Sequence, residues 1–196
     1  KARDKGIVSL NGQLLANTYV PPNWEETQEV PEVFIEHIKY LIPDPVEHEI
    51  FLNWLAAKIQ KPDKRSYGIV MVADETYGTG RSWLKDMISA VLKGGVNTTS
   101  LAAMYGKGTS AEQTYNDWQS RCQFLVIEEA KDSGLSRDDF FNGYTTFKSN
   151  CDTSVSYDQR VNPKYGVTRY ENFYYNVLIF SNHADAMCIP DGDLRL

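Results

Sequence analysis

The spacing of apolar residues predicts two helices near the start of the chain. Between Pro31 and Gln60 the apolar residues recur at helical intervals on both sides of a Pro43-Asp44-Pro45 break. The residues before them, 1–22, are mostly polar and end in two prolines, so we expect an extended arm there. A charged connection that contains a proline, at residues 61–65, predicts a subdomain boundary after residue 62.

Three short apolar runs predict central strands of a sheet that is covered on both faces. Each run is too short and too continuous for an amphipathic helix. The runs are Tyr67–Val72, Phe124–Ile127 and Val177–Phe180. After the first run, apolar residues from Leu84 to Leu92 keep helical spacing and stop before Gly94 and Gly95. Strand, glycine turn, helix and strand make an α/β unit, and we expect loops and a hairpin in the polar, aromatic residues 133–170.

Composition narrows the class of protein. The 196 residues are 42% hydrophobic and 23% charged, which is typical of a globular chain of about one domain. No apolar run approaches the roughly 20 residues of a membrane helix, so a spanning protein is excluded. The net charge of -6 means that nucleic acid must bind a local basic patch. The three widely spaced cysteines fit neither a disulfide framework nor a zinc site, which favours a reducing compartment.

The glycine turn after the first strand predicts a phosphate-binding loop. Gly78 and Gly80 allow backbone N–H groups to face phosphate oxygens, and the start of the following helix attracts the same anion. The candidate nucleotide-binding residues are Gly78, Thr79, Gly80, Arg81 and Ser82, and Ser82 is also a candidate magnesium ligand. The match to G-x-x-x-x-G-K-S/T is incomplete, because Glu75 replaces the first Gly and Arg81 replaces the Lys. Nucleotide binding is therefore favoured over hydrolysis, and a purely structural turn is the alternative.

Polar residues follow the other two predicted strands, at the sheet edge where α/β proteins bind ligands. Glu128 is the candidate magnesium ligand, and Glu129 is the candidate base that orients the attacking water. Asn182 follows the third strand, where its amide can hydrogen-bond the γ-phosphate or the water. Arg195 either reaches the phosphate of a neighbouring subunit in a ring or pairs with Asp193 at the surface.

Motifs along nearly the whole chain resemble the primase-helicase proteins of phages and mobile elements, which look like superfamily 3 helicases of the AAA+ class. The motifs are Asn17–Pro22, Trp54–Pro62, Gly78–Ser82, Phe124–Glu129, Phe180–His183 and Asp193–Arg195. The resemblance implies an α/β fold: a P-loop, AAA+-like central parallel sheet with flanking helices and an N-terminal helical subdomain. Residues 1–62 hold the arm and that subdomain, and residues 63–196 hold the ATPase core. A C-terminal lid usually follows, and we expect this chain, which starts without Met, to be a fragment that lacks it.

The resemblance also implies a function. It implies an ATP- and Mg²⁺-binding helicase motor that acts as a hexameric-type ring on single-stranded DNA, with a primase or polymerase domain fused upstream, in the cytoplasm of a phage's bacterial host. Asn182 then acts as the sensor and Arg195 as the arginine finger. The family usually has Lys in place of Arg81, and Asp-Arg-Arg in place of Asp193-Leu194-Arg195. The alternative is a degenerate ring or clamp that supports an attached primase-polymerase without hydrolysing ATP.

The same family lines its ring channel with a basic hairpin that precedes the sensor strand. The corresponding candidates for binding nucleic acid are Lys148, Arg160, Lys164, Tyr165 and Arg169. Cations suit phosphates and aromatic faces suit bases, and Lys164-Tyr165-Gly166 is the candidate hairpin tip. The alternative is a solvated loop whose tyrosines pack against the body of the domain.

Overall fold

The computed structural model describes residues 6–10, 12–17, 27–73, 78–104, 115–128, 144, 148, 151 and 158–183. The chain forms two compact units, Lys1–Pro31 and Glu32–Leu196. Part of the first unit is an antiparallel hairpin of β1 (Gly6–Leu10) and β2 (Gln13–Asn17), where an extended arm was expected. The second unit holds the helices and the central sheet together. The boundary after residue 62 remains a prediction.

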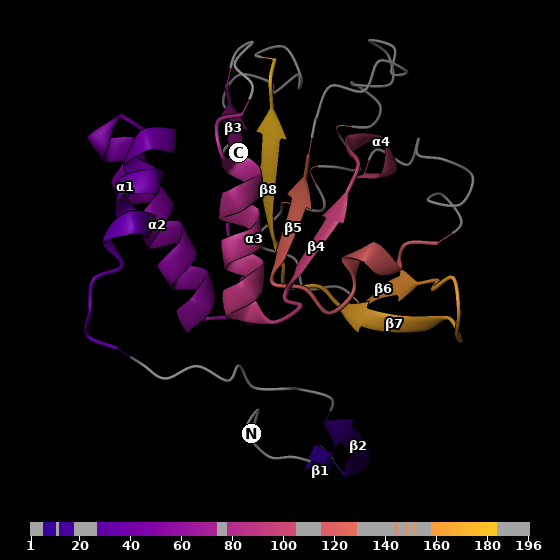
Figure 1. Ribbon diagram of the computed structural model, residues 1–196. Coiled ribbons are helices and arrows are strands. Elements are labelled where there is room, and N and C mark those ends of the chain that lie inside the picture. Colours follow the sequence, from indigo (N-terminus) through magenta and orange to yellow (C-terminus); the bar gives the residue numbers. More distant parts are fainter. Residues whose placement is uncertain are drawn as a thin grey trace. The chain divides into compact units, whose positions relative to one another are not determined.

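Among the described residues of the second unit, four parallel strands form the central sheet (Figure 1). Their order is β3 (Ile69–Val72), β8 (Asn176–Ser181), β5 (Phe124–Ile127) and β4 (Val96–Thr99). This arrangement confirms the predicted α/β class with a central parallel sheet and flanking helices. Every residue of β5 and β8 is buried, as expected for central strands. The expectation is wrong for β3, which lies at the sheet edge and leaves Val72 47% exposed.

Three helices confirm the predicted helical segments. They are α1 (Glu32–Leu41), α2 (Pro45–Gln60) and α3 (Arg81–Leu92). Asp44 caps α2 by accepting hydrogen bonds from the N–H groups of Val46 and Glu47 at 2.9 and 3.0 Å. Two shorter elements, α4 (Leu101–Met104) and the 3-10 turn η1 (Asp117–Gln119), lie between β4 and β5 in the sequence. No helix among the described residues has both the length and the apolar character needed to cross a membrane.

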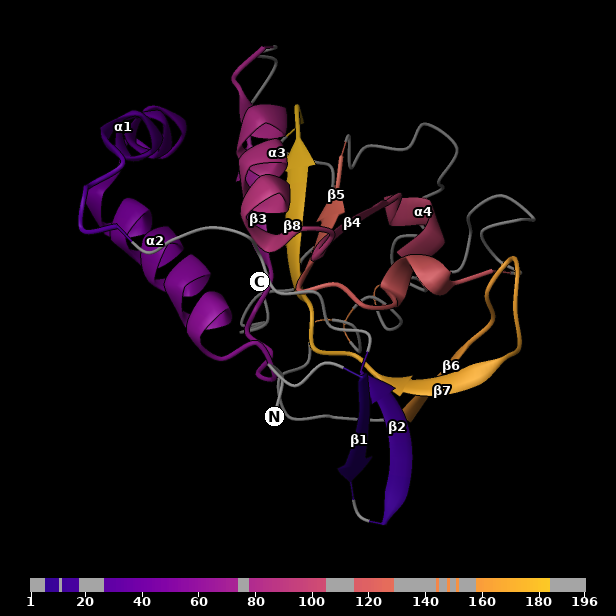
Figure 2. The same cartoon turned by 60° about the horizontal axis from the view of Figure 1, so that its bottom comes forward.

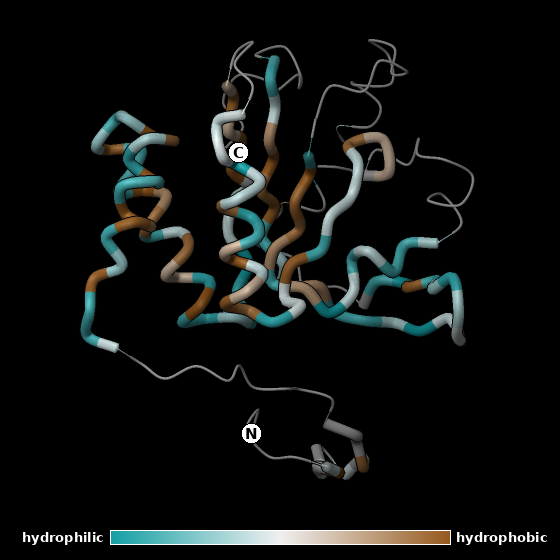
Figure 3. The backbone as a smooth tube through the Cα atoms, viewed as in Figure 1, coloured by the Kyte–Doolittle hydropathy of each residue, from teal (hydrophilic) through white to brown (hydrophobic). Residues whose placement is uncertain are grey.

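The two faces of the sheet carry separate hydrophobic cores, because alternate residues of a strand point to opposite faces. One core joins the residues of α1, α2 and α3 to Phe124, Val126, Leu178 and Phe180. The other joins Leu125, Ile127, Val177 and Ile179 to the residues that follow β4 and precede β8. Figure 2 shows α1, α2 and α3 together beside the strands, and Figure 3 shows how strongly apolar the central strands are. The sheet is therefore held rigidly, which fixes the positions of the strand ends.

An antiparallel hairpin, β6 (Asp158–Val161) and β7 (Arg169–Asn172), confirms the hairpin expected before the third predicted strand. The pairing of Val161 with Arg169 leaves Lys164, Tyr165 and Gly166 in the turn, where the tip was predicted. Because β7 ends shortly before β8 begins, the hairpin lies at the end of the sheet where the strands start (Figure 1).

A buried lysine ties α2 to the segment before β8. Lys58 is 2% exposed, and its ammonium donates to the carbonyls of Pro62 and Lys64, at 3.0 and 2.8 Å, and to that of Tyr174. The pKa of Lys58 is lowered to about 8, mainly by burial; Arg65 acts in the same direction, whereas Cys122 and Asp63 act in the opposite direction. Three carbonyl acceptors compensate in part for removing this amine from water.

Candidate nucleotide site and nucleic-acid interface

The carboxyl ends of β3, β5 and β8 bring the predicted nucleotide-binding residues into one cavity. Its volume is about 640 Å³, within the usual range of small-molecule sites. The lining residues are Gly78, Thr79, Gly80, Arg81, Ser82, Glu128, Phe180, Ser181 and Asn182. Residues far apart in the sequence therefore meet at the carboxyl ends of the strands, where α/β folds bind ligands.

The glycine loop has the backbone form that its sequence predicts. Gly78 and Gly80 have φ angles of 71° and 87°, in the left-handed region that glycine adopts without steric cost. Gly80 is the N-cap residue of α3 and supplies no side-chain cap. The open start of a twelve-residue helix faces the cavity, which is an arrangement suited to an anion.

Arg81 lines the cavity but directs its guanidinium toward the protein. Its Nε donates to Thr79 Oγ1 at 3.1 Å, and Nη1 donates to the Met71 carbonyl at 3.1 Å and to the Ser181 carbonyl. Its Nη2 donates to Asn182 Oδ1. Burial lowers the pKa of Arg81 from its ordinary value.

The two candidate magnesium ligands lie on the same side of the cavity. Ser82 Oγ is 3.4 Å from Glu128 Oε1, so a hydroxyl and a carboxylate face each other across a small gap. Lys85, one turn further along α3, places its ammonium 3.2 and 3.3 Å from the two Glu128 oxygens. The pair is partly exposed, with 21% of the Lys85 side chain and 33% of the Glu128 side chain accessible.

Sequence reasoning missed two residues that contact this site. Lys85 is one, and the other is His37 of α1, whose Nε2 donates to the Gly80 carbonyl at 3.1 Å. The His37 ring also packs edge-on against Trp83, with 4.4 Å between the ring centroids. A lone histidine in an amphipathic helix gives no sequence signal for such a contact, since the two residues are 43 positions apart.

Two predicted site residues, Glu129 and Arg195, lie outside the described residues, as does Glu75, which replaces the first Gly of the phosphate-loop pattern. The roles of Glu129 as base and of Arg195 as arginine finger remain predictions.

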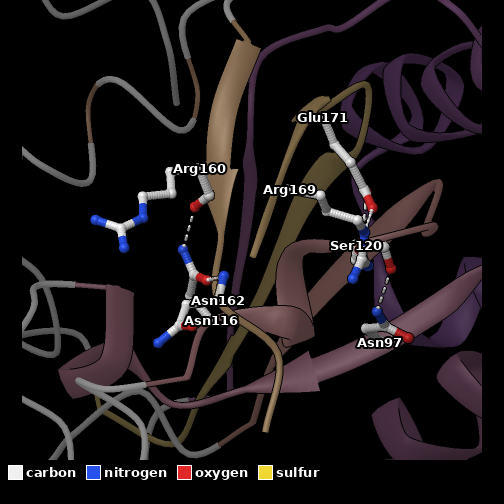
Figure 4. Close-up of polar contacts among 7 residues, drawn as sticks. All are labelled: Asn97, Asn116, Ser120, Arg160, Asn162, Arg169 and Glu171. Carbon is white, nitrogen blue, oxygen red and sulfur yellow. Dashed lines mark hydrogen bonds and ion pairs between the residues drawn. The ribbon is translucent and has the colours of Figure 1, made fainter. Parts of the chain in front are cut away.

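The β6–β7 hairpin is fastened to the segment before β5 by polar contacts along both of its strands (Figure 4). On the β6 side, the Asn116 amide donates to the Arg160 carbonyl at 2.9 Å and accepts from Asn162 N at 2.7 Å. On the β7 side, Arg169 Nη2 donates to Ser120 Oγ at 2.9 Å, and Ser120 in turn donates to Glu171. These contacts hold the two strands of the hairpin next to the turn, in which Lys164 and Tyr165 are exposed.

The candidates for binding nucleic acid differ in their surroundings. Lys164 and Tyr165 are exposed at the tip, with Tyr165 85% exposed and the Lys164 ammonium 5.6 Å from the Tyr165 ring centroid. Arg160 is exposed, and its guanidinium extends away from the network in Figure 4. Arg169 instead pairs with Glu171. Lys148 is half-buried.

The carboxylate of Glu171 stabilises this anchoring. Burial raises its pKa, but hydrogen bonds from Ser120 and Arg169 and the charges of Arg169 and Arg121 outweigh that effect, so the pKa lies below its ordinary value. Glu171 is therefore ionised at neutral pH and holds Arg169 in place.

Comparisons with known proteins support the fold. The model of a family described as "Family of unknown function (DUF5906)" matches residues 75–195. No curated protein matches the sequence.

Similar solved structures come from a phage protein and a viral helicase. The apo structure of the C-terminal region (305–718) of phage NrS-1 has a TM-score of 0.79 and 17% identity, over all of this chain and 45% of that chain. An A-form apo structure of the same region gives 0.75 and 18%, over all of this chain and 44% of that one. JCV helicase with a bound acetamide compound gives 0.52 and 12%, over 84% of this chain and 43% of that one. The chain thus has a helicase-like fold and spans less than half of each matched chain.

Proposed function

The chain belongs to the DUF5906 family, and we propose that it is the ATP-binding, helicase-like motor domain of a phage-type DNA replication protein. The observation that carries this proposal is the single cavity that joins the glycine loop to Glu128 and Asn182. The likeness to the NrS-1 C-terminal region and to JCV helicase supports it at the level of fold. In this proposal the motor works as a hexameric-type ring on single-stranded DNA within a longer protein that carries a primase or polymerase domain.

The residues of the cavity suit ATP and Mg²⁺. The N–H groups of the loop and of the α3 N-terminus bind the phosphates. Ser82 and Glu128 offer the oxygen ligands that Mg²⁺ prefers, and Mg²⁺ commonly keeps several waters and phosphate oxygens as its other ligands. Within the described ranges no group of three or more His, Cys, Asp or Glu side chains that could hold a metal ion comes together. Bound Mg²⁺ neutralises charge that develops on the phosphates.

The hydrolysis step assigns a separate role to each remaining candidate. Glu129 orients the water that attacks the γ-phosphate and accepts its proton, and Asn182 hydrogen-bonds the γ-phosphate. Arg195 reaches the phosphates bound by the neighbouring subunit of the ring, where it stabilises the negative charge of the transition state. Lys85 donates to both oxygens of Glu128, so a metal ion held by Glu128 would share or compete for these oxygens with the Lys85 ammonium.

A titration of Mg-ATP by calorimetry tests the binding site. We expect saturable binding by the wild-type chain, and at least a tenfold weaker Mg²⁺-dependent affinity for Ser82→Ala and Glu128→Gln. Glu49→Gln, which changes an exposed carboxylate on α2, is the matched control and keeps wild-type affinity. Equal affinity of wild type, Ser82→Ala and Glu128→Gln would remove these two residues from the site.

Arg81, which stands where the phosphate-loop pattern has Lys, favours a second candidate function, a ring or clamp module that binds DNA without hydrolysing ATP. Steady-state ATP hydrolysis by the parent protein with single-stranded DNA separates the two. A motor shows DNA-stimulated hydrolysis that Glu129→Gln reduces at least 100-fold. A parent protein that binds both single-stranded DNA and Mg-ATP, and hydrolyses no ATP, has the second candidate function.

A further inference from the structure

The hydrogen bonds of Arg81 use most of its capacity to donate. A guanidinium has five N–H donors in one plane. Four hydrogen bonds leave it: one from Nε to Thr79, two from Nη1 to backbone carbonyls, and one from Nη2 to Asn182. At most one N–H therefore remains for a phosphate oxygen, whereas a bidentate grip needs two.

The acceptors belong to neighbouring strands. Met71 lies in β3 and Ser181 ends β8, and the two strands pair in parallel with Val72 opposite Ser181. The same Ser181 carbonyl accepts the N–H of Ala73 at 2.9 Å. Arg81 thus ties the first turn of α3 to the carboxyl ends of both strands, next to the point where β3 enters the glycine loop.

The surroundings suit a guanidinium better than an ammonium. Arg81 is half-buried, and its Cζ lies 5.9 Å from the Phe180 ring centroid, where a planar, weakly hydrated cation packs well. A lysine has one nitrogen with three donors and cannot reach a threonine, two carbonyls and an amide together. The residue that departs from the phosphate-loop pattern is therefore matched to protein acceptors.

We propose that Arg81 is a positioning residue that clamps the carboxyl ends of β3 and β8 and orients Asn182 toward the cavity, and that it does not grip the phosphates. This inference rests on the proposed function, because the cavity is taken as the nucleotide site. The phosphates are then bound by backbone N–H groups of the loop and the α3 N-terminus. Asn182 keeps its amide nitrogen for the ligand, because its Oδ1 accepts from Arg81.

Thermal unfolding of a small set of variants tests the clamp. We expect Arg81→Met and Arg81→Lys to lower Tm by about 5 °C or more, since several hydrogen bonds are lost and lysine cannot replace them. Arg160→Met is the matched control and shifts Tm by less than about 2 °C, because an exposed arginine contributes little to stability. Asn182→Ala combined with Arg81→Met lowers Tm by clearly less than the sum of the single shifts. Additive shifts, or an unchanged Tm for Arg81→Lys, overturn the clamp.

The affinity for nucleotide distinguishes a positioning role of Arg81 from a role as a phosphate ligand. At a temperature where all variants are folded, we expect the Kd for Mg-ATP to change less than threefold in Arg81→Met. If Arg81→Met weakens binding more than tenfold and Arg81→Lys restores it, Arg81 is a phosphate ligand and the proposal is wrong. If the wild-type parent protein binds no nucleotide, the proposed function fails. The Tm values still decide whether Arg81 holds the carboxyl ends of β3 and β8 together.

Discussion

Gly78 and Gly80 have similar φ angles but different surroundings. A Cβ atom added at Gly78 meets nothing within 4 Å, whereas one added at Gly80 would lie 2.5 Å from His37 Cε1. Gly80 is therefore required twice, for its left-handed backbone and for the approach of α1 to the loop. The histidine and the glycine form one contact between helix and loop.

We predict that Gly80→Ala lowers the free energy of unfolding by about 2–3 kcal/mol, from left-handed strain of about 1 kcal/mol plus the clash with His37. Gly78→Ala has the strain alone, with a loss of about 1 kcal/mol. The double variant His37→Ala/Gly80→Ala recovers the steric part. Urea unfolding measures all of them, and equal losses for the two glycine variants would contradict the contact.

Lys58 makes stability depend on pH. Its pKa falls from 10.5 in the unfolded chain to about 8 in the fold, so the unfolded state binds more protons between these values. The cost of charging the buried amine is complete below pH 8 and disappears as the pH rises toward 10.5. Cys122 acts in the opposite sense above pH 9, because burial raises the pKa of its thiol to about 12.

We predict that the unfolding free energy of the wild type rises by about 1 kcal/mol relative to that of Lys58→Met between pH 7 and pH 9. Taking the difference between the two proteins largely cancels the Cys122 contribution, which both share. Chemical unfolding at several pH values gives the comparison. A difference that stays flat or falls with pH would show that the ammonium is not desolvated.

At the scale of elements, the β6–β7 hairpin is held along its two strands, whereas Lys164 and Tyr165 in its turn are exposed. Asn116 satisfies the β6 backbone, and Ser120 with Glu171 holds β7 through Arg169. The anchor and the exposed tip residues are thus different sets, so mutations can separate their effects.

We predict that Asn116→Ala speeds amide hydrogen exchange in residues 158–172 and costs about 1–2 kcal/mol of stability, because two hydrogen bonds to the β6 backbone are lost. Lys164→Ala, at the tip, leaves exchange and stability unchanged. Hydrogen exchange followed by mass spectrometry measures the exchange rates in both variants. Unchanged exchange in Asn116→Ala would mean that other contacts hold the hairpin.

At the scale of the whole molecule, the net charge of -6 opposes DNA binding. Any attraction must therefore come from local cations such as those of the hairpin, and in the proposed ring the repeated hairpins would multiply weak contacts. The sheet places the hairpin where the strands start and the cavity where they end, so the proposed DNA and nucleotide sites lie at opposite ends of the sheet.

We predict that the parent protein binds single-stranded DNA with an affinity that falls steeply with salt. Lys164→Ala lowers that affinity and reduces the slope of log K against log salt by about 1, as loss of one phosphate contact requires. Lys61→Ala, which removes an exposed cation after α2, leaves the slope unchanged. Fluorescence anisotropy with a labelled oligonucleotide measures the slopes. A slope unaffected by Lys164→Ala would remove the hairpin tip from the interface.

The local sequence pattern determined which segments form the three long helices, three strands of the sheet and the glycine loop. Helical spacing predicted α1, α2 and α3, continuous apolar runs predicted three of the four sheet strands, and glycines predicted the loop after β3. These features are readable because each depends on residues within a few positions of one another. The edge strand β4 was missed, because its residues Val96–Thr99 are only partly apolar and pair with β5.

Tertiary structure alone decided which partners the side chains have. The position of β3 at the edge of the sheet depends on the strand order. An apolar run has the same sequence pattern whether its strand lies at the edge or in the centre of the sheet. The contacts of Arg81 with Ser181 and of His37 with Gly80 join positions 100 and 43 residues apart. Hydrogen-bond partners at such separations follow from packing, which periodicity and composition do not encode.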